Sequence, residues 1–233
     1  MSAVETALDT SRFRFEREAM VTRQLRDRGI TDERVLEAML RLPRHLFVPD
    51  EERYSAYRDT ALPIGFGQTI SQPYMVATML EALQLKGHER VLDIGTGSGY
   101  QAALLGLLTR KVYSVEIIPE LTARARSTIE ALGLDNVRVV QANGSIGLPQ
   151  AAPFDAIVVA AGAPDVPPAL TAQLAEGGTL VIPVGGDAWQ ELLRIRKRDG
   201  RLIREEVTTC AFVPLVGEQG WGQSQRSGSM WRV

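Results

Sequence analysis

A glycine-rich turn in the middle of the chain has the pattern of a nucleotide-binding site. The β-type run Arg90–Ile94 leads into Gly95, Gly97 and Gly99, and a helical run follows. Glycine lets the chain turn tightly and lets a ligand approach the backbone at the start of a helix. Glu116 closes the next β-type run, 21 residues after Gly95, where such folds place an acid that hydrogen-bonds ribose hydroxyls. The order of strand, loop, helix, strand and acid indicates a nucleotide-like ligand.

The residues around this loop distinguish between classes of nucleotide ligand. Dinucleotide sites have a third glycine where Tyr100 stands here, and no Gly-Lys-Ser/Thr sequence follows as in a P-loop. Asp93 lies two residues before the first glycine. Its carboxylate would repel a pyrophosphate and attract the sulfonium of S-adenosylmethionine. We therefore predict an S-adenosylmethionine site. The structural alternative is a turn whose glycines serve packing alone.

The dipeptide Asn143-Gly144 follows the third β-type run, where such folds commonly present a polar side chain to the adenine. An asparagine amide can accept a hydrogen bond from the exocyclic amine and donate one to a ring nitrogen. Asn-Gly is equally typical of a tight turn. The sequence leaves both interpretations open.

The elements that must position these residues alternate between strand and helix. The predicted strands are Arg90–Ile94, Lys111–Val115, Val137–Gln141, Asp155–Ala160 and Gly178–Val184, and the helical runs between them are Tyr100–Leu108, Pro119–Leu132 and Pro167–Ala175. This alternation predicts an α/β fold with a doubly wound, mostly parallel sheet. After Gly186 the alternation stops. Leu192–Arg196 and Val207–Val213, around the turn Asp199-Gly200, predict an antiparallel hairpin at the edge of the sheet.

The N-terminal third of the chain is predicted to form helices that cover the sheet, called the helical cover below. Charged and apolar residues alternate from Arg12 to Arg28, and Thr31 can cap a second helix that ends near Pro43. A loop interrupted by Gly and Pro is expected from Leu62 to Pro73, followed by a helix over Tyr74–Leu85. We expect a flexible terminus (1–11), a single domain (12–221) and a flexible tail (222–233). Within the domain, residues 12–85 form the cover and a substrate loop, and residues 86–221 form the cofactor-binding sheet.

Composition excludes several classes of protein. The formal net charge is −2, without the basic excess of a general nucleic-acid binder. One cysteine, Cys210, excludes a disulfide framework, and with two histidines it cannot build a zinc site of the usual spacing. No signal peptide or membrane-spanning run is evident. We expect a cytoplasmic protein without metal, membrane or nucleic-acid partners, and a monomer.

Several segments together resemble the protein-L-isoaspartate (D-aspartate) O-methyltransferase family, over about residues 12 to 217. The resemblance is carried by Arg44–Pro49, Ile64–Tyr74, Val91–Ala103, Pro153–Asp155, Gln173–Leu174, Gly177–Gly178, Val181–Pro183 and Phe212–Leu215. Membership would imply a Rossmann-like, class I methyltransferase fold. It would also imply methyl transfer from S-adenosylmethionine to the α-carboxylate of isoaspartyl residues in damaged proteins and peptides, with S-adenosylhomocysteine as the product.

The same resemblance implies roles for single residues. The family's catalytic serine falls on Ser71, which alternatively could cap the following helix. The implied cofactor-binding residues are Thr69, Ile70, Asp93, Gly95, Thr96, Gly97, Ser98, Gly99, Glu116, Ile117, Asn143 and Gly144. Asn143 departs from the aspartate that the family usually has, which removes a charge near the adenine. A carboxylate acceptor is already ionised at pH 7, so Ser71 would orient it and would need no general base.

Two other functions compete with repair. A methyltransferase of the same fold could act on another acceptor. The motif of base amino-methyltransferases, Asn/Asp-Pro-Pro-aromatic, is absent after Asp155–Ala160, and the Pro167-Pro168 pair is flanked by Val166 and Ala169. A cofactor-binding module without catalysis is the second alternative, and the presence of Ser71 argues against it.

Overall fold

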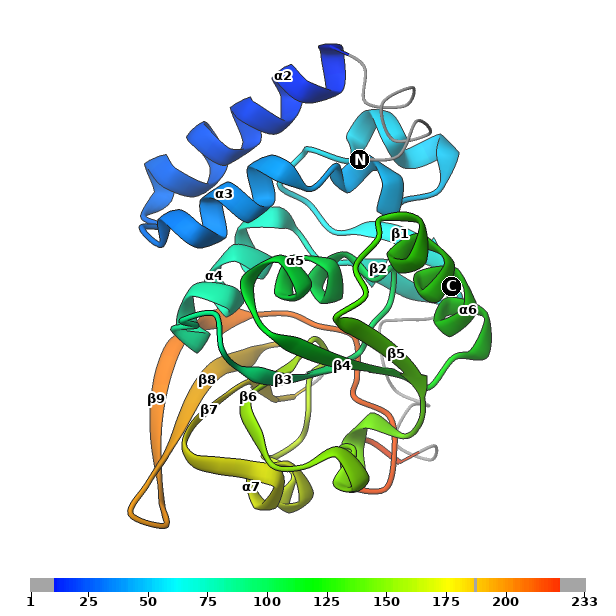
Figure 1. Ribbon diagram of the computed structural model, residues 1–233. Coiled ribbons are helices and arrows are strands. Elements are labelled where there is room, and N and C mark those ends of the chain that lie inside the picture. The colour runs from blue at the N-terminus through cyan, green and yellow to red at the C-terminus, as the bar shows by residue number, and fades with distance from the viewer. Residues whose placement is uncertain (1–10, 187, 223–233) are drawn as a thin grey trace.

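The centre of the fold is a seven-stranded sheet (Figure 1), seen in a computed structural model that describes residues 11–186 and 188–222. Its strand order is β5-β4-β3-β6-β7-β8-β9. The strands are β3 (Arg90–Ile94), β4 (Lys111–Glu116), β5 (Val137–Gln141), β6 (Phe154–Val159), β7 (Leu174–Gly185), β8 (Gln190–Arg198) and β9 (Arg201–Cys210). Neighbours among β3 to β7 pair in parallel, whereas β8 is antiparallel to both β7 and β9. The predicted α/β sheet with an antiparallel edge hairpin is confirmed.

Alternate residues of the central strands enter two separate apolar cores, as the two-residue period of a strand requires. Val91 of β3 and Val158 of β6 belong to the core beneath most of the helices. Leu92 and Ile157, next to them in sequence, belong to the core on the opposite face. Both faces are therefore buried, which explains why these strands read as nearly continuous apolar runs.

The two faces are covered unequally (Figure 1). On one face lie α4 (Pro73–Leu83), α5 (Tyr100–Leu108) and α6 (Pro119–Ala131), and α2 (Ser11–Ala19) and α3 (Glu33–Arg41) pack outside them. The other face carries the short helix α7 (Pro168–Gln173) and loop segments, whose Leu148, Leu170 and Leu215 complete its core. The predicted helical cover thus forms a second layer over one face of the sheet.

The start of α3 differs from the prediction that Thr31 caps it. The cap is Asp32, whose side chain accepts hydrogen bonds from the backbone nitrogens of Arg34 (2.9 Å) and Val35 (3.4 Å). Thr31 is used elsewhere, because its backbone nitrogen and hydroxyl both donate to Glu81 of α4. A tertiary contact therefore decided which of two adjacent capping residues serves the helix.

The expected loop from Leu62 to Pro73 is also different, because it contains a two-stranded hairpin. β1 (Leu62–Gly65) pairs antiparallel with β2 (Gln68–Ile70). Its turn has three consecutive residues with positive φ, at Gly65 (90°), Phe66 (56°) and Gly67 (66°). Glycine adopts this conformation without steric cost, so the residues that read as strand breakers form the turn of the hairpin. Arg124 of α6 donates to the carbonyl oxygen of Ile64 (2.9 Å) and ties the hairpin to the main domain.

The predicted edge hairpin turns at Asp199-Gly200 as expected, but its second strand begins earlier. β9 starts at Arg201 and ends at Cys210, whereas we expected a strand over Val207–Val213. Most of β9 is exposed, so the burial pattern that marks a strand in sequence is weak there. The predicted termini, 1–11 and 222–233, lie almost wholly outside the described residues.

Candidate functional site

A cavity of about 230 Å³ lies at the carboxyl ends of β3, β4 and β6. In an open α/β sheet this edge is where ligands bind. Three parts of the chain line the cavity: the hairpin with the segment that follows it, the glycine loop with the end of β4, and a C-terminal segment. Of the predicted site residues, the lining includes Thr69, Ile70, Ser71, Gly95, Thr96, Gly97, Ser98, Glu116, Ile117 and Gly144.

The glycine loop turns from β3 into α5 with positive φ at Gly95 (88°), Gly97 (53°) and Gly99 (90°). Side chains at these positions would be strained, which is the reason for the glycines. Gly99 does not line the cavity. A Cβ there would lie 3.2 Å from Cβ of Ala125, so Gly99 lets α5 begin against α6. It supports the loop from behind.

Glu116 joins the end of β4 to the glycine loop and is the one charged residue among the described residues lining the cavity. One carboxylate oxygen accepts a hydrogen bond from the backbone nitrogen of Gly97 (2.9 Å). The other accepts from the nitrogens of Ile117 and Ile118, both at 2.9 Å. A buried carboxylate needs such partners. They fix its position at the cavity wall, where it favours a cationic or hydroxyl-bearing ligand over an anionic one.

Asp93 lies behind the loop and does not line the cavity, although we predicted that its carboxylate would lie near the ligand and bind the cofactor. Its fully buried carboxylate accepts hydrogen bonds from Gln101 Nε2 (2.8 Å) and Ser114 Oγ (2.7 Å). Ser114 Oγ is also 2.6 Å from Thr96 Oγ1 in the loop. Burial raises the pKa of Asp93 to about 6, although both hydrogen bonds favour the ionised form. Asp93 is therefore linked to the cavity wall through Ser114 and Thr96.

Asn143 also lies outside the cavity lining, although Gly144 belongs to it. The Asn143 side-chain oxygen accepts hydrogen bonds from the backbone nitrogen (3.1 Å) and the hydroxyl (2.8 Å) of Ser145. These contacts cap the short turn Gly144–Ile146. Of the two interpretations left open by the sequence, the turn accounts for the contacts that the side-chain oxygen makes. An aspartate in its place would keep that acceptor.

Ser71 lies between β2 and α4 and lines the cavity with its half-buried side chain. The alternative that it caps α4 is wrong, because the residue at that position is Gln72. Its hydroxyl makes no hydrogen bond to any other residue within 11–186 and 188–222. Its backbone is fixed by the fully buried Arg44, which donates to the carbonyl oxygens of Ser71 (Nη2, 2.8 Å) and Ala56 (Nε, 2.8 Å). The Arg44 guanidinium also lies over the Tyr100 ring, 4.8 Å from its centroid, and burial lowers its pKa to about 10.

A second cavity, of about 220 Å³, adjoins the first. Both are lined by Thr69, Ser71, Ala160 and Val213. Ser71 therefore stands at the junction of the two cavities. This arrangement suits a reaction between two ligands, in which one occupies each cavity and the serine contacts the point where they meet.

The prediction from the sequence missed the C-terminal part of this site. Val213–Val216 line the first cavity, and Gly162 accepts from the backbone nitrogen of Leu215 (2.8 Å) and donates to the carbonyl of Val213 (2.8 Å). Trp221 Nε1 donates to the Gly162 carbonyl oxygen (2.9 Å). The available signal was the Phe212–Leu215 motif, which looked like the family but carried no implied role.

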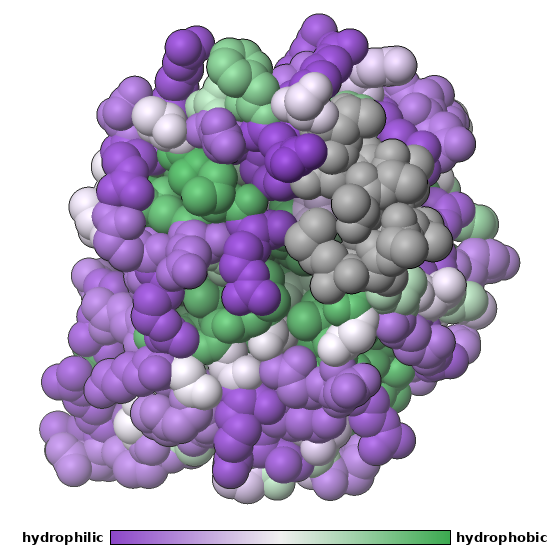
Figure 2. Space-filling view, turned by 45° about the horizontal axis from the view of Figure 1, so that its top comes forward, coloured by the Kyte–Doolittle hydropathy of each residue, from purple (hydrophilic) through white to green (hydrophobic). Residues whose placement is uncertain are grey.

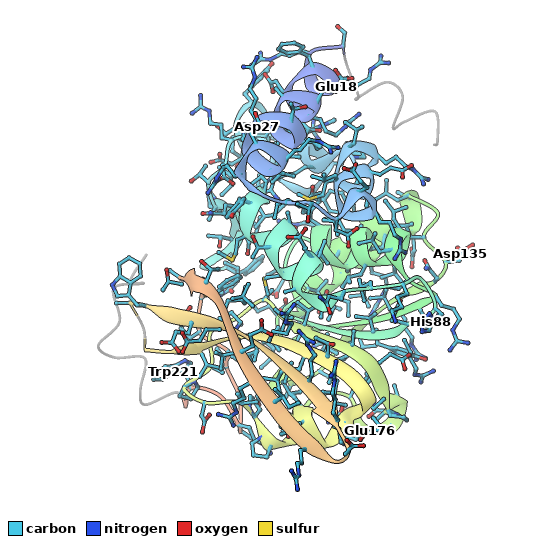
Figure 3. All side chains as sticks on the ribbon, turned by 90° about the vertical axis from the view of Figure 1, so that its left-hand side faces the viewer. Glu18, Asp27, His88, Asp135, Glu176 and Trp221 are labelled. Carbon is cyan, nitrogen blue, oxygen red and sulfur yellow. The ribbon has the colours of Figure 1, made fainter. Side chains whose placement is uncertain are left out.

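The two histidines lie away from the junction of the cavities, and the one cysteine is buried, with a thiol whose pKa is raised. His45 is buried in the helical cover, with Nδ1 2.8 Å from the Tyr57 hydroxyl. His88 lies on the side of the molecule away from Trp221 (Figure 3). Cys210 is buried as predicted, and burial raises its pKa to about 12. Among residues 11–186 and 188–222, no cluster of His, Cys, Asp and Glu is arranged to hold a metal ion.

A comparison with known protein families distinguishes between the three candidate functions: isoaspartyl repair, methyl transfer to another acceptor, and cofactor binding without catalysis. The model of the protein-L-isoaspartate(D-aspartate) O-methyltransferase family matches residues 16–220. The chain belongs to this family. The match extends over the helical cover, the whole sheet and the C-terminal segment of the cavity. The other two candidate functions, a different acceptor and a non-catalytic module, are not favoured.

Curated relatives support this protein-L-isoaspartate O-methyltransferase assignment. A protein of that name from Geobacter metallireducens is 56% identical over 91% of this chain and 99% of its own. One from Marinobacter nauticus is 58% identical over 88% and 94%, and one from Koribacter versatilis is 52% identical over 93% and 98%. The chain thus corresponds to nearly the full length of these proteins.

Solved structures agree with the fold. A protein-L-isoaspartate O-methyltransferase is 30% identical, with a TM-score of 0.80 over 88% of this chain and 67% of its own. A beta-aspartate methyltransferase structure from Plasmodium falciparum is 29% identical, with a TM-score of 0.75 over 86% and 98%. That second structure is a complex with S-adenosyl-L-homocysteine.

Proposed function

We propose that this chain transfers a methyl group from S-adenosylmethionine to the free carboxylate of damaged residues in proteins and peptides, which is the α-carboxylate of an L-isoaspartyl residue and the side-chain carboxylate of a D-aspartyl residue. Membership of the family and relatives at 52–58% identity support this repair activity. The observation in the structure that carries the proposal is the position of Ser71, at the junction of the cavity at the glycine loop with a second cavity.

The first cavity fits S-adenosylmethionine, which when bound supplies a methyl group on a positively charged sulfur. Glu116 is the one charged residue in its described lining, and its carboxylate suits the ribose hydroxyls and the positive charge of this cofactor. We assign direct contact with the cofactor to the predicted residues that line the cavity: Thr69, Ile70, Gly95, Thr96, Gly97, Ser98, Glu116, Ile117 and Gly144. Asp93, Gly99 and Asn143 hold this set in place from behind.

Ser71 is proposed to orient the acceptor. A carboxylate carries its reactive charge at pH 7, so no residue has to remove a proton. The serine hydroxyl, which bonds no other described residue, is available to donate a hydrogen bond to one carboxylate oxygen. That bond holds the other oxygen in line with the methyl group. Alignment of two reactants can contribute roughly 7–11 kcal/mol to catalysis, so positioning can carry most of the rate enhancement.

The test is methyl transfer from labelled S-adenosylmethionine to one peptide in two forms, isoaspartyl and normal aspartyl. We expect label in the isoaspartyl form alone. Ser71→Ala should lower kcat about a hundredfold, the usual effect of removing a positioned hydrogen-bond donor. Ser127→Ala, an exposed serine on α6, is the matched control and should retain full activity. Equal labelling of both peptides, or full activity of Ser71→Ala, would contradict the proposal.

Further predictions concern the partners of the chain and its location in the cell. Isoaspartyl-containing proteins are the partners we propose. No helix found in residues 11–186 and 188–222 has the length and apolar character needed to cross a bilayer. The cytoplasmic location, the monomeric state and the lack of nucleic-acid partners remain predictions.

A further inference from the structure

Most of the residues that line the second cavity are apolar, which goes beyond what holding a carboxylate requires. Met75, Phe212, Ala61 and Ala211 contribute to its lining, and no charged residue does so among the described residues. Its polar contributors are Thr69, Ser71, Gln72 and Thr209, of which Thr69 and Ser71 also line the first cavity. A ligand in this cavity therefore meets polar groups at Thr69 and Ser71, where the two cavities join, and mainly apolar side chains elsewhere.

Trp189 is the unusual member of this lining. With 74% of its surface exposed, it is the most exposed large hydrophobic residue among those described. Figure 2 shows one face of the molecule, on which hydrophilic residues predominate and hydrophobic residues form the smaller part of the surface. An exposed tryptophan beside a cavity is typical of recognition surfaces, since the indole offers a large rigid contact area.

The backbone next to Trp189 is held firmly. Gln190 is buried, and its side chain accepts from the backbone nitrogen of Phe212 (2.7 Å) and donates to the carbonyl of Gly186 (3.0 Å). The Cys210 thiol also contacts the Gln190 carbonyl oxygen (3.6 Å). These bonds attach the start of β8 to the cavity wall, so that Trp189 stays beside the cavity although it is exposed.

We propose that Trp189 is a specificity-determining residue that contacts the side chain of the residue directly before the isoaspartate, and that it favours a large apolar residue there. This inference rests on the proposed function. In an isoaspartyl residue the chain continues through the former side chain, so the free carboxylate and the preceding amide share one carbon atom. With the carboxylate at Ser71, we therefore place the preceding residue, which is attached through that shared carbon, in the second cavity. The apolar lining and Trp189 then favour leucine over alanine or glutamate.

The experiment compares isoaspartyl peptides that differ only in the preceding residue: leucine, alanine or glutamate. For the wild-type enzyme, kcat/KM should be about tenfold higher for leucine than for alanine, the range expected for a partly open apolar contact. Glutamate should be the poorest substrate. In Trp189→Ala the leucine preference should fall to about twofold or less, and Trp189→Phe should retain part of it. KM for S-adenosylmethionine should not change, because Trp189 does not line the first cavity.

Phe15→Ala is the matched control, since Phe15 is an exposed aromatic residue (67%) on α2, away from both cavities. It should leave the leucine preference unchanged. An unaltered preference in Trp189→Ala would overturn the inference. So would a Trp189-dependent preference found instead in a second set of peptides, which carry leucine, alanine or glutamate directly after the isoaspartate. If the wild-type enzyme methylates none of the peptides, the proposed function itself fails, and this result is distinct from a lost preference.

Discussion

At the scale of single residues, the site separates the groups that line the cavity from the groups behind them that hold them in place. Glu116 reaches the cavity with both oxygens already bonded to backbone nitrogens. Asp93 lies behind the glycine loop and accepts hydrogen bonds from Gln101 and Ser114. The sequence placed both acids at the site, because their spacing from the glycines is informative. It could not tell which one faces the ligand, since that depends on how the side chains pack around the end of β3.

The buried Asp93 makes stability depend on pH. Its pKa is raised from 3.8 to about 6 by burial, so between these values the folded state keeps a proton that the unfolded state has lost. This advantage is present at low pH and is lost as the pH rises through 6. Asp93→Asn cannot titrate. We expect the free energy of unfolding of the wild type, relative to Asp93→Asn, to fall by about 2–3 kcal/mol between pH 4 and pH 7. Urea unfolding of both proteins at the two pH values measures this, and a difference that does not change with pH would contradict it.

At the scale of elements, the sequence was most informative where a segment's conformation is fixed locally. The predicted bounds of β3, β5 and α5 match the structure, because their apolar runs end at clear turn residues. The β1–β2 hairpin was missed, because Gly65 and Gly67 indicate a break in a strand as readily as a hairpin turn. The cap of α3 was misplaced by one residue, because the contact of Thr31 with Glu81 comes from another helix.

The segment between β2 and α4 has no regular structure, and Arg44 holds it. Arg44→Lys should lower kcat about tenfold with little change in KM for S-adenosylmethionine, because one ammonium cannot reproduce the two-carbonyl geometry that fixes Ser71. It should also lower the free energy of unfolding by about 2–3 kcal/mol, because it disturbs a buried cation. Kinetics and urea unfolding of the same preparation separate the two effects.

Arg34→Lys is the matched control for this loss. Arg34 also bonds two carbonyl oxygens, those of Leu85 (2.6 Å) and Leu108 (2.7 Å), but far from Ser71. It should lose some stability and keep its kcat. Equal losses of kcat in Arg44→Lys and Arg34→Lys would mean that Arg44 has a general structural role and does not position the serine.

At the scale of the whole molecule, the cofactor cavity is formed where three parts of the chain that are distant in sequence meet. Thr69–Ser71, the glycine loop with Glu116, and Val213–Val216 all line it. The last segment is attached at Gly162, through hydrogen bonds to Val213, Leu215 and Trp221. Sequence analysis could predict the first two parts from motifs. It gave no role to the third, since the return of the chain to the end of β6 is a property of the complete fold.

A ligand in this cavity should therefore stabilise the protein as a whole. S-adenosylhomocysteine at about 100 times its Kd should add about 2.7 kcal/mol to the free energy of unfolding. For a chain of this size the midpoint of thermal unfolding should rise by about 5–10 °C. NAD⁺ at the same concentration should give no shift, because the charge of Asp93 behind the loop would repel its pyrophosphate. Differential scanning calorimetry with each ligand tests this. An equal shift with NAD⁺ would contradict the choice of cofactor class. No shift with S-adenosylhomocysteine would mean that the three segments do not form one binding site.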